Sequence, residues 1–358
     1  MKKKIAFFCD KYQELNISTG GEKLNFILIC QLVEKGFIVD VFAKNYPDLK
    51  SVANDYYNIC DIDVNSVTNN YDIVLSEGAN YPSDITYIHG HSYNYRISKT
   101  QNKFQHFIYK IISNKSHKKR LKADELIKKN IENINKIIVS SNVLKQDYIE
   151  NFGISEDKLV TIPPPIISSI VDYKLKNKKK TVFGISANGF VNKGGFILIK
   201  AIKELTNTHN DFGVRVIYQK AKKNLALQFL LNFYGIRKYI DFIPTQKNMS
   251  TFYNSLDFCL QTSFFETFAM VASEAMNHYK PVIVTDVCGV CDILINGKNS
   301  FICSTKTNRV KNLVECMKKA IDLSEVEYEK MAKNAFESTL ELSVENFIHK
   351  YIEEIRNV

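Results

Sequence analysis

The sequence predicts an α/β fold made of two βα domains. With 358 residues, the chain is longer than one ordinary hydrophobic core requires. Predicted strands and helices alternate through the first half, the pattern breaks at a stretch rich in proline and lysine, and the alternation then restarts. Such alternation is typical of parallel sheets with helices on both faces.

The first half is predicted to contain five strands. Short apolar runs bounded by polar residues lie at 4–9, 38–42, 73–76, 86–89 and 137–140. Stretches with apolar residues at helical spacing, among them 22–35 and 143–152, separate these runs. The lysines before the first run imitate a signal peptide, but the run ends at Asp10, so we expect a first strand and a cytoplasmic protein.

A proline-rich stretch separates the two halves. Pro163, Pro164 and Pro165 cannot continue a helix, and the lysine-rich residues 174–180 suit a polar linker. Six further strands are expected at 181–186, 214–218, 240–243, 258–261, 282–285 and 300–303. We therefore predict an N-terminal domain over 1–172 and a C-terminal domain over 178–339. A last amphipathic helix, 340–358, is expected to pack back on the first domain.

The chain is basic, which suggests an anionic partner. Its 48 lysines and arginines exceed its 38 acidic residues, giving a net charge of +10. In the segment 96–129, basic residues interleave with apolar ones, as suits docking on an anionic membrane surface. A merely solvated basic helix remains an alternative, and nucleic acid is disfavoured. No stretch approaches the roughly 18 apolar residues of a membrane span.

Two short motifs could suggest metal binding, and we interpret neither as a metal site. Cys288 and Cys291 form a CxxC pair, but no second pair of ligands accompanies them. Asp61 and Asp63 form a DxD, which occurs often by chance and lies in an irregular acidic stretch. We expect no metal and no cofactor, and the scattered cysteines favour a reducing compartment.

Two glutamates eight positions apart, with seven residues between them, frame an apolar segment of the second half. Glu266 is expected in a loop after the strand 258–261, and Glu274 in a helix that begins at Thr267 as its N-cap. The first N–H groups of such a helix, those of Phe268, Ala269 and Met270, favour a phosphate. Together these groups would suit a nucleotide-sugar, although spacing alone favours two surface glutamates beside a core helix.

Other candidate residues follow predicted strands, where open α/β sheets bind ligands. Gly20 and Gly21 precede a helix and would let the backbone approach a phosphate, although turn glycines are the alternative. His89 and His91 come where a strand ends, and either could bond a sugar hydroxyl, with His89 favoured. Lys193, before two glycines and a helix, could neutralise a diphosphate.

Taken together, these residues resemble the retaining glycosyltransferases of family 4. The resemblance runs from Gly20 to Phe301. It is strongest in the ordered set Phe242-Ile243-Pro244, Tyr253, Leu256-Asp257, Glu266 to Glu274, Lys280-Pro281-Val282 and Asn296-Gly297-Lys298-Asn299-Ser300. It implies the GT-B architecture, in which two Rossmann-like βαβ domains face each other across a cleft.

The resemblance also implies roles for the candidate residues. Glu274 would bind the ribose hydroxyls and Glu266 the transferred sugar, while Lys193 and the amides of residues 268–270 would hold the diphosphate. Gly20 and Gly21 would approach the diphosphate and the acceptor, and His89 would touch the donor sugar.

The chain departs from the family pattern at three places, one of which is Cys288-Gly289 where the family has a glycine pair before the last strand. Ala187 and Asn188 stand where the family usually has an arginine, so Lys220 would assist Lys193. Thr267-Phe268-Ala269 replaces a glycine-rich run and narrows the room near the sugar.

The expected function is transfer of a hexose from a nucleotide-diphosphate sugar, preferably a UDP-sugar, with retention of configuration. The acceptor would be a hydroxyl of a cell-surface glycan precursor or a lipid-linked glycan, as in lipopolysaccharide, capsule or O-antigen synthesis. A non-catalytic sugar-nucleotide binding protein and a nucleotide-sugar 2-epimerase on the same fold are the alternatives.

Overall fold

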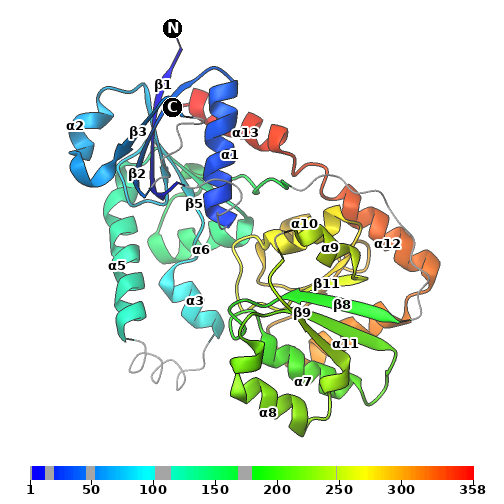
Figure 1. Ribbon diagram of the computed structural model, residues 1–358. Coiled ribbons are helices and arrows are strands. Elements are labelled where there is room, and N and C mark those ends of the chain that lie inside the picture. Colours follow the sequence, from blue (N-terminus) through cyan, green and yellow to red (C-terminus); the bar gives the residue numbers. More distant parts are fainter. Residues whose placement is uncertain (1, 13–19, 46–52, 101–113, 168–179, 247) are drawn as a thin grey trace. The chain divides into compact units, whose positions relative to one another are not determined.

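The computed structural model describes residues 2–12, 20–45, 53–100, 114–167, 180–246 and 248–358 (Figure 1). The chain divides into two compact units. The N-terminal unit comprises Met1–Pro165 together with Leu342–Val358, and the C-terminal unit comprises Ile166–Glu341. The predicted linker around residue 175 lies outside the described residues. None of the described helices is both long and apolar enough to cross a membrane.

The N-terminal unit contains a parallel sheet whose described strands follow the order β3-β2-β1-β4-β5-β6-β7. The bounds are β1 Lys4–Lys11, β2 Ile38–Asn45, β3 Asp55–Asn58, β4 Ile73–Glu77, β5 Ile85–Ile88, β6 Lys136–Val139 and β7 Leu159–Thr161. All five predicted strands are present, so the α/β prediction is confirmed for this unit. The sequence did not suggest β3, which is mostly polar, or β7, which has only three residues.

Helices cover both faces of this sheet, because successive side chains of a strand point to opposite faces. Ile5 and Phe7 of β1 pack in one apolar cluster with α1 (Gly20–Glu34) and α13 (Val344–Arg356). Ala6 and Phe8 belong to a cluster on the opposite face. The other described helices are α2 (Val64–Thr68), α3 (Tyr93–Thr100), α5 (Asn114–Asn130) and α6 (Asn142–Phe152).

Helix α13 returns the end of the chain to the N-terminal unit. Its apolar face, with Phe347, Ile348, Tyr351, Ile352 and Ile355, is buried in the same cluster as β1 and β2. Figure 1 shows this helix beside α1. The last part of the sequence therefore completes the first core.

The C-terminal unit contains a second parallel sheet, in the order β10-β9-β8-β11-β12-β13 among the described strands. The bounds are β8 Thr181–Ser186, β9 Phe212–Ile217, β10 Ile240–Ile243, β11 Phe258–Gln261, β12 Val282–Thr285 and β13 Ser300–Cys303. All six predicted strands are present. The helices are α7 Gly195–Leu205, α8 Leu225–Phe233, α9 Met249–Asn254, α10 Met270–Asn277, α11 Arg309–Asp322 and α12 Glu325–Glu337.

The strand order places one candidate site in each unit. In the N-terminal sheet the order reverses between β1 and β4, and in the C-terminal sheet it reverses between β8 and β11. Loops that leave such a pair of strands diverge to opposite faces and open a crevice at the carboxyl edge of the sheet. Ligand-binding residues are therefore expected in the loops after β4, β8 and β11.

Candidate functional site

The loops after β8 and β11 are bound to each other at the reversal point of the C-terminal sheet. The N–H of Phe264 donates to the carbonyl of Asn192 at 3.0 Å, and the hydroxyl of Thr262 donates to the carbonyl of Lys193 at 2.7 Å. Gly194 has φ +72°, and a Cβ atom there would overlap the carbonyl oxygen of Thr262. Only glycine permits this close approach. The contact brings Lys193 to the loop that carries Glu266.

Lys193 and Glu266 form an ion pair. The Glu266 carboxylate also accepts hydrogen bonds from Gln261 Nε2 at 3.2 Å and from Ser263 Oγ at 3.3 Å. Both charged side chains keep about a quarter of their surface exposed, 26% for Lys193 and 22% for Glu266. The pair therefore combines a fixed cation and a fixed carboxylate that a ligand can reach. Gln261 and Ser263 were not predicted, although Gln261 ends an apolar strand and Ser263 follows it.

The helix after Glu266 begins later than predicted. Helix α10 starts at Met270, after Ala269 with φ +80°, so the prediction that Thr267 caps it is wrong. The reason is a tertiary contact, because the carbonyls of Glu266 and Phe268 accept from Gly289 N at 3.1 Å and Val290 N at 2.6 Å. These bonds hold 266–268 against the loop after β12.

The shifted helix start changes which amides are available to an anion. Of the three amides predicted to hold phosphate, only that of Met270 lies in the first helical turn, and Phe268 and Ala269 are buried before it. The N–H groups of Met270 and Val271 lie in the first turn of α10, where an α-helix supplies no carbonyl of its own to pair them. An anion at this end of α10 would be favoured by those amides and by the helix dipole.

Glu274 is held by a network between α9 and α10. The hydroxyl of the buried Tyr253 donates to Glu274 Oε2 at 2.5 Å. The His278 ring lies 2.8 Å from the Glu274 carbonyl and 3.0 Å from the hydroxyl of Ser250. Burial raises the pKa of Tyr253 and lowers that of His278, so both are neutral near pH 7. Tyr253 therefore positions the carboxylate as a neutral donor, while Ser250 and His278 were not predicted.

Asn188 and Lys220 lie at the carboxyl ends of β8 and β9, and both are exposed. The Asn188 side chain is 3.5 Å from the hydroxyl of Thr245 and 3.5 Å from the amide of Gln219. The Asn188 side chain thus lies near the segments that follow β9 and β10. Their contribution to phosphate binding stays a prediction.

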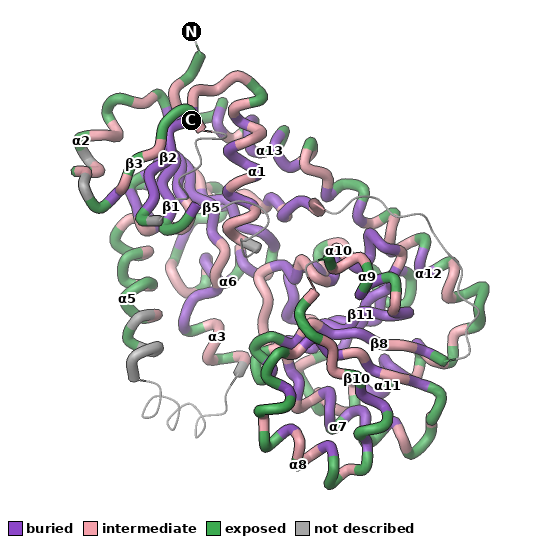
Figure 2. Tube along the Cα trace, viewed as in Figure 1, coloured by how far each residue is buried: buried purple, intermediate pink, exposed green. Residues whose placement is uncertain are grey.

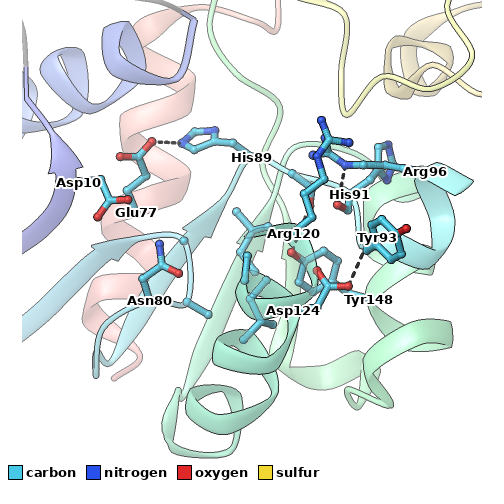
Figure 3. A pocket seen from close by; sticks show the side chains of 16 residues that line it. Asp10, Glu77, Asn80, His89, His91, Tyr93, Arg96, Arg120, Asp124 and Tyr148 are labelled. Atoms are coloured by element: carbon cyan, nitrogen blue, oxygen red, sulfur yellow. Dashed lines mark hydrogen bonds and ion pairs between the residues drawn. The ribbon is translucent and has the colours of Figure 1, made fainter. Parts of the chain in front are cut away.

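A second cluster lies at the reversal point of the N-terminal sheet. Glu77 ends β4 and His89 follows β5, with His89 Nε2 3.7 Å from Glu77 Oε1 (Figure 3). A Cβ atom at Gly21 would lie 3.5 Å from Glu77 Oε1 and 3.7 Å from the His89 ring. Gly21, the second residue of α1, therefore lies close to His89. Glu77 was not predicted, and its only signal in the sequence is a carboxylate at the end of an apolar strand.

The ionisation of this cluster follows from its burial. Burial raises the pKa of Glu77 to about 6 and lowers the pKa of His89 to about 4. Near pH 7 the carboxylate is therefore charged and the imidazole is neutral. His89 Nε2 is a buried atom without a hydrogen-bond partner in the described part of the chain.

A cavity of about 290 Å³ opens next to this cluster. Glu77, His89 and Asn80 line one part of it, and Arg96 and Arg120 line another (Figure 3). Such a cavity is large enough for part of a sugar-sized ligand.

His91 belongs to the support of this cavity. Its side chain is fully buried, with Nδ1 2.8 Å from Asp147 Oδ2. Asp147 also accepts from the amide and the hydroxyl of Ser92, at 2.8 and 2.5 Å. His91 thus fixes the loop after β5 that carries His89, and a direct role in binding stays a prediction.

The CxxC and DxD motifs are the two motifs that could have suggested a metal site. Among the described residues, no group of three or more His, Cys, Asp and Glu side chains is placed to hold a metal ion. Burial raises the pKa of Cys291 to about 12 and that of Cys288 further, so both are protonated thiols near pH 7. Asp63 follows β3 in the N-terminal unit, and the Asp61 side chain lies outside the described part. Metal independence stays a prediction.

The basic segment 96–129 is described only in part. Residues 101–113, which include its apolar residues Phe104, Phe107 and Ile108, lie outside the described residues. A role of this segment on membranes therefore stays a prediction.

Solved structures of known proteins resemble both units. WaaG, a glycosyltransferase involved in lipopolysaccharide biosynthesis, matches with a TM-score of 0.73 at 16% identity, over 97% of this chain and 98% of its own. HepE of Anabaena in complex with UDP-glucose matches with a TM-score of 0.71 at 15% identity, over 99% and 100%. At these identities the likeness establishes the fold, so the predicted pair of Rossmann-like units is confirmed.

Sequence comparison adds a family match for the C-terminal unit. The GPI3 subunit of phosphatidylinositol N-acetylglucosaminyltransferase from Saccharomyces cerevisiae is 23% identical over 214 residues, which cover 56% of this chain and 46% of that protein. The chain spans about half the length of the curated relatives it matches. The model of the family described as glycosyl transferases group 1 matches residues 169–338, nearly all of the unit that carries Lys193, Glu266 and Glu274. This unit therefore resembles the glycosyl transferases group 1 family over just under half of the chain.

Proposed function

We propose that this protein is a retaining hexosyltransferase that uses a nucleotide-diphosphate sugar, with a UDP-sugar favoured. The observation that carries the proposal is the Lys193–Glu266 ion pair before the start of α10, in a unit that matches glycosyl transferases group 1. UDP is favoured because solved structures of the similar protein HepE contain UDP and UDP-glucose.

The donor would bind along the edge from α10 to the loop after β8. Glu274, fixed by Tyr253, would accept the two ribose hydroxyls. The diphosphate would lie at the first turn of α10, beside the ammonium of Lys193, with help from Asn188 and Lys220. Glu266 would accept hydroxyls of the sugar to be transferred.

The chemistry then needs little beyond positioning and charge. The bond between the anomeric carbon and the diphosphate oxygen breaks, and the acceptor oxygen forms a bond on the same face of the sugar. The acceptor proton passes to the departing phosphate. Negative charge grows on that phosphate in the transition state, where Lys193 and the α10 amides stabilise it in place. Glu266 positions the sugar and is not required as a nucleophile.

The acceptor would be a hydroxyl of a cell-surface glycan precursor or of a lipid-linked glycan. Two similar proteins support this class, since one takes part in lipopolysaccharide biosynthesis and the name of the other states phosphatidylinositol as its substrate. Glu77 and His89, with Gly20 and Gly21 nearby, would bind sugar hydroxyls at the N-terminal cavity. Such an enzyme would act in the cytoplasm or on the inner face of the membrane.

A donor panel tests the proposal. The full chain is incubated with UDP-, GDP- and ADP-hexoses and a glycolipid acceptor, and calorimetry measures binding of the three nucleotide diphosphates. We expect transfer from one donor class. We further expect Glu274→Ala to weaken binding of that nucleotide diphosphate about tenfold to a hundredfold, since hydrogen bonds to a charged group contribute about 1.5–3 kcal/mol.

The matched control is Glu315→Ala on the exposed face of α11, which should bind and react like the unchanged protein. Nucleotide binding without transfer would support a binding protein, and a changed hexose on the nucleotide would support an epimerase. Normal donor affinity and turnover in Glu274→Ala would overturn the site assignment.

We expect the titration of Glu77 to set the acid limb of the profile of kcat/KM against pH. Its pKa of about 6 lies above the ordinary value of 4.5, so the carboxylate is charged above about pH 6 and is protonated as the pH falls through that value. We expect kcat/KM to fall in the same range, because a protonated carboxyl accepts sugar hydroxyls less well. Glu77→Gln should lower kcat/KM and flatten this limb between about pH 5 and 7. Glu132→Gln, at an exposed position, should leave it in place, and an unchanged limb in Glu77→Gln would assign it elsewhere.

A further inference from the structure

Helix α8 exposes a stripe of large apolar side chains. Leu225, Phe229 and Phe233 are 81%, 66% and 71% exposed. They are spaced four residues apart, so they lie along one face of the helix. The rings of Phe229 and Phe233 stack, with centroids 5.8 Å apart. The opposite face of the helix, with Leu227 and Leu231, is buried in the core of the C-terminal unit.

The stripe is not needed for packing within the C-terminal unit. Single exposed apolar residues are common on protein surfaces, but three in one stripe indicate an interaction site. Figure 2 shows exposed positions along α8.

Exposed basic residues precede and follow the helix that carries the stripe. Residues 212–240 contain six basic residues, Arg215, Lys220, Lys222, Lys223, Arg237 and Lys238, and no aspartate or glutamate. Lys222 and Lys223 are exposed just before α8, and Arg237 and Lys238 are exposed just after it. A helix with exposed aromatic and aliphatic side chains and basic residues at both ends has the chemistry of a membrane-surface anchor.

We infer that α8 docks this protein on an anionic lipid surface. Leu225, Phe229 and Phe233 enter the boundary between lipid headgroups and acyl chains, and Lys222, Lys223 and Lys238 contact the lipid phosphates. A second copy of the chain fits less well, because a symmetric contact would bring two basic surfaces together. The surface belongs to the C-terminal unit, whereas the basic segment 96–129 belongs to the N-terminal unit. Docking through α8 does not depend on the proposed donor chemistry.

The test is co-sedimentation of the full chain with lipid vesicles. Vesicles of phosphatidylcholine with about 30% phosphatidylglycerol are compared with phosphatidylcholine alone, at low and at physiological salt. We expect binding to the anionic vesicles and release as salt rises. Phe229→Ser with Phe233→Ser should weaken binding at least tenfold. Lys222→Glu with Lys223→Glu should weaken it at least as much, since each basic residue near such a surface contributes about fivefold.

Two matched variants make the test specific. Val326→Ser with Lys330→Glu makes the same kinds of change at exposed positions of α12 and should bind like the unchanged protein. Lys118→Glu with Lys122→Glu changes the exposed part of α5. If only the α5 variant releases the protein, the basic segment is the anchor and the inference is overturned.

Three other results would also overturn the inference. These are absence of binding to anionic vesicles, an oligomer without lipid that Phe229→Ser with Phe233→Ser dissociates, and tighter binding to RNA than to vesicles. Calorimetry with UDP reports separately on the proposed donor site. Failure of donor binding with intact vesicle binding would reject the proposed function and leave the membrane surface standing.

Discussion

Replacing Lys193 by alanine should lower kcat by about 10²–10³, which is the effect of removing one preset group that stabilises a developing oxyanion. The ammonium is paired with Glu266, which lies four positions before the first residue of α10. Its removal leaves Glu266 with hydrogen bonds from Gln261 and Ser263, so the loop is expected to keep its structure. Steady-state kinetics with the preferred donor measures the change.

The control for this prediction is Lys200→Ala. Lys200 lies on α7, the helix that follows Lys193, and its side chain is exposed. It should react at the unchanged rate. If Lys193→Ala retains full kcat with a bound donor, charge on the leaving diphosphate must be stabilised by other groups, and the proposed role of Lys193 is wrong.

Gly194→Ala is expected to cause the largest loss of stability. The alanine would have to adopt φ +72° and its Cβ would overlap the backbone of Thr262. The left-handed conformation costs about 1–2 kcal/mol and overpacking about 1–3 kcal/mol, so the free energy of unfolding should fall by about 3 kcal/mol. Urea denaturation measures this change. Transfer activity should fall as well, because the displaced loop carries Lys193.

Gly189→Ala separates the cost of the left-handed backbone conformation from the cost of the steric overlap. Gly189 lies in the same loop with φ +87°, but nothing lies within 4 Å of the position of its Cβ. This variant should lose only about 1–2 kcal/mol, for the backbone conformation alone. Equal losses in both variants would show that the contact between the loops after β8 and β11 contributes little.

The start of α10 shows where prediction from sequence failed. Thr267 before an apolar run is a normal N-cap signal, and local preference alone supports it. In the structure, the carbonyls of Glu266 and Phe268 are bound by Gly289 and Val290, which are more than twenty positions away. The bonds that set the helix start are therefore not local, and no pattern near Thr267 could reveal them.

Glu77 was missed for a similar reason. One carboxylate at the end of an apolar strand carries little information by itself. It gains meaning because β4 lies between β1 and β5 in the sheet, which places it beside Gly21 and His89. His91 follows the same strand end as His89, and the structure adds that its ring is buried against Asp147. A direct role of His91 in binding stays a prediction.

The sequence by itself determined the two α/β units, most strand positions, and the candidates Lys193, Glu266, Glu274 and His89. These follow from apolar periodicity and from polar residues at strand ends, which are local properties of the chain. The tertiary structure alone decided the pairing of Lys193 with Glu266, the positioning of Glu274 by Tyr253, and the proximity of Glu77 to His89. Each of these depends on which strands are neighbours and on close backbone contacts between loops, and both arise only when distant segments pack together.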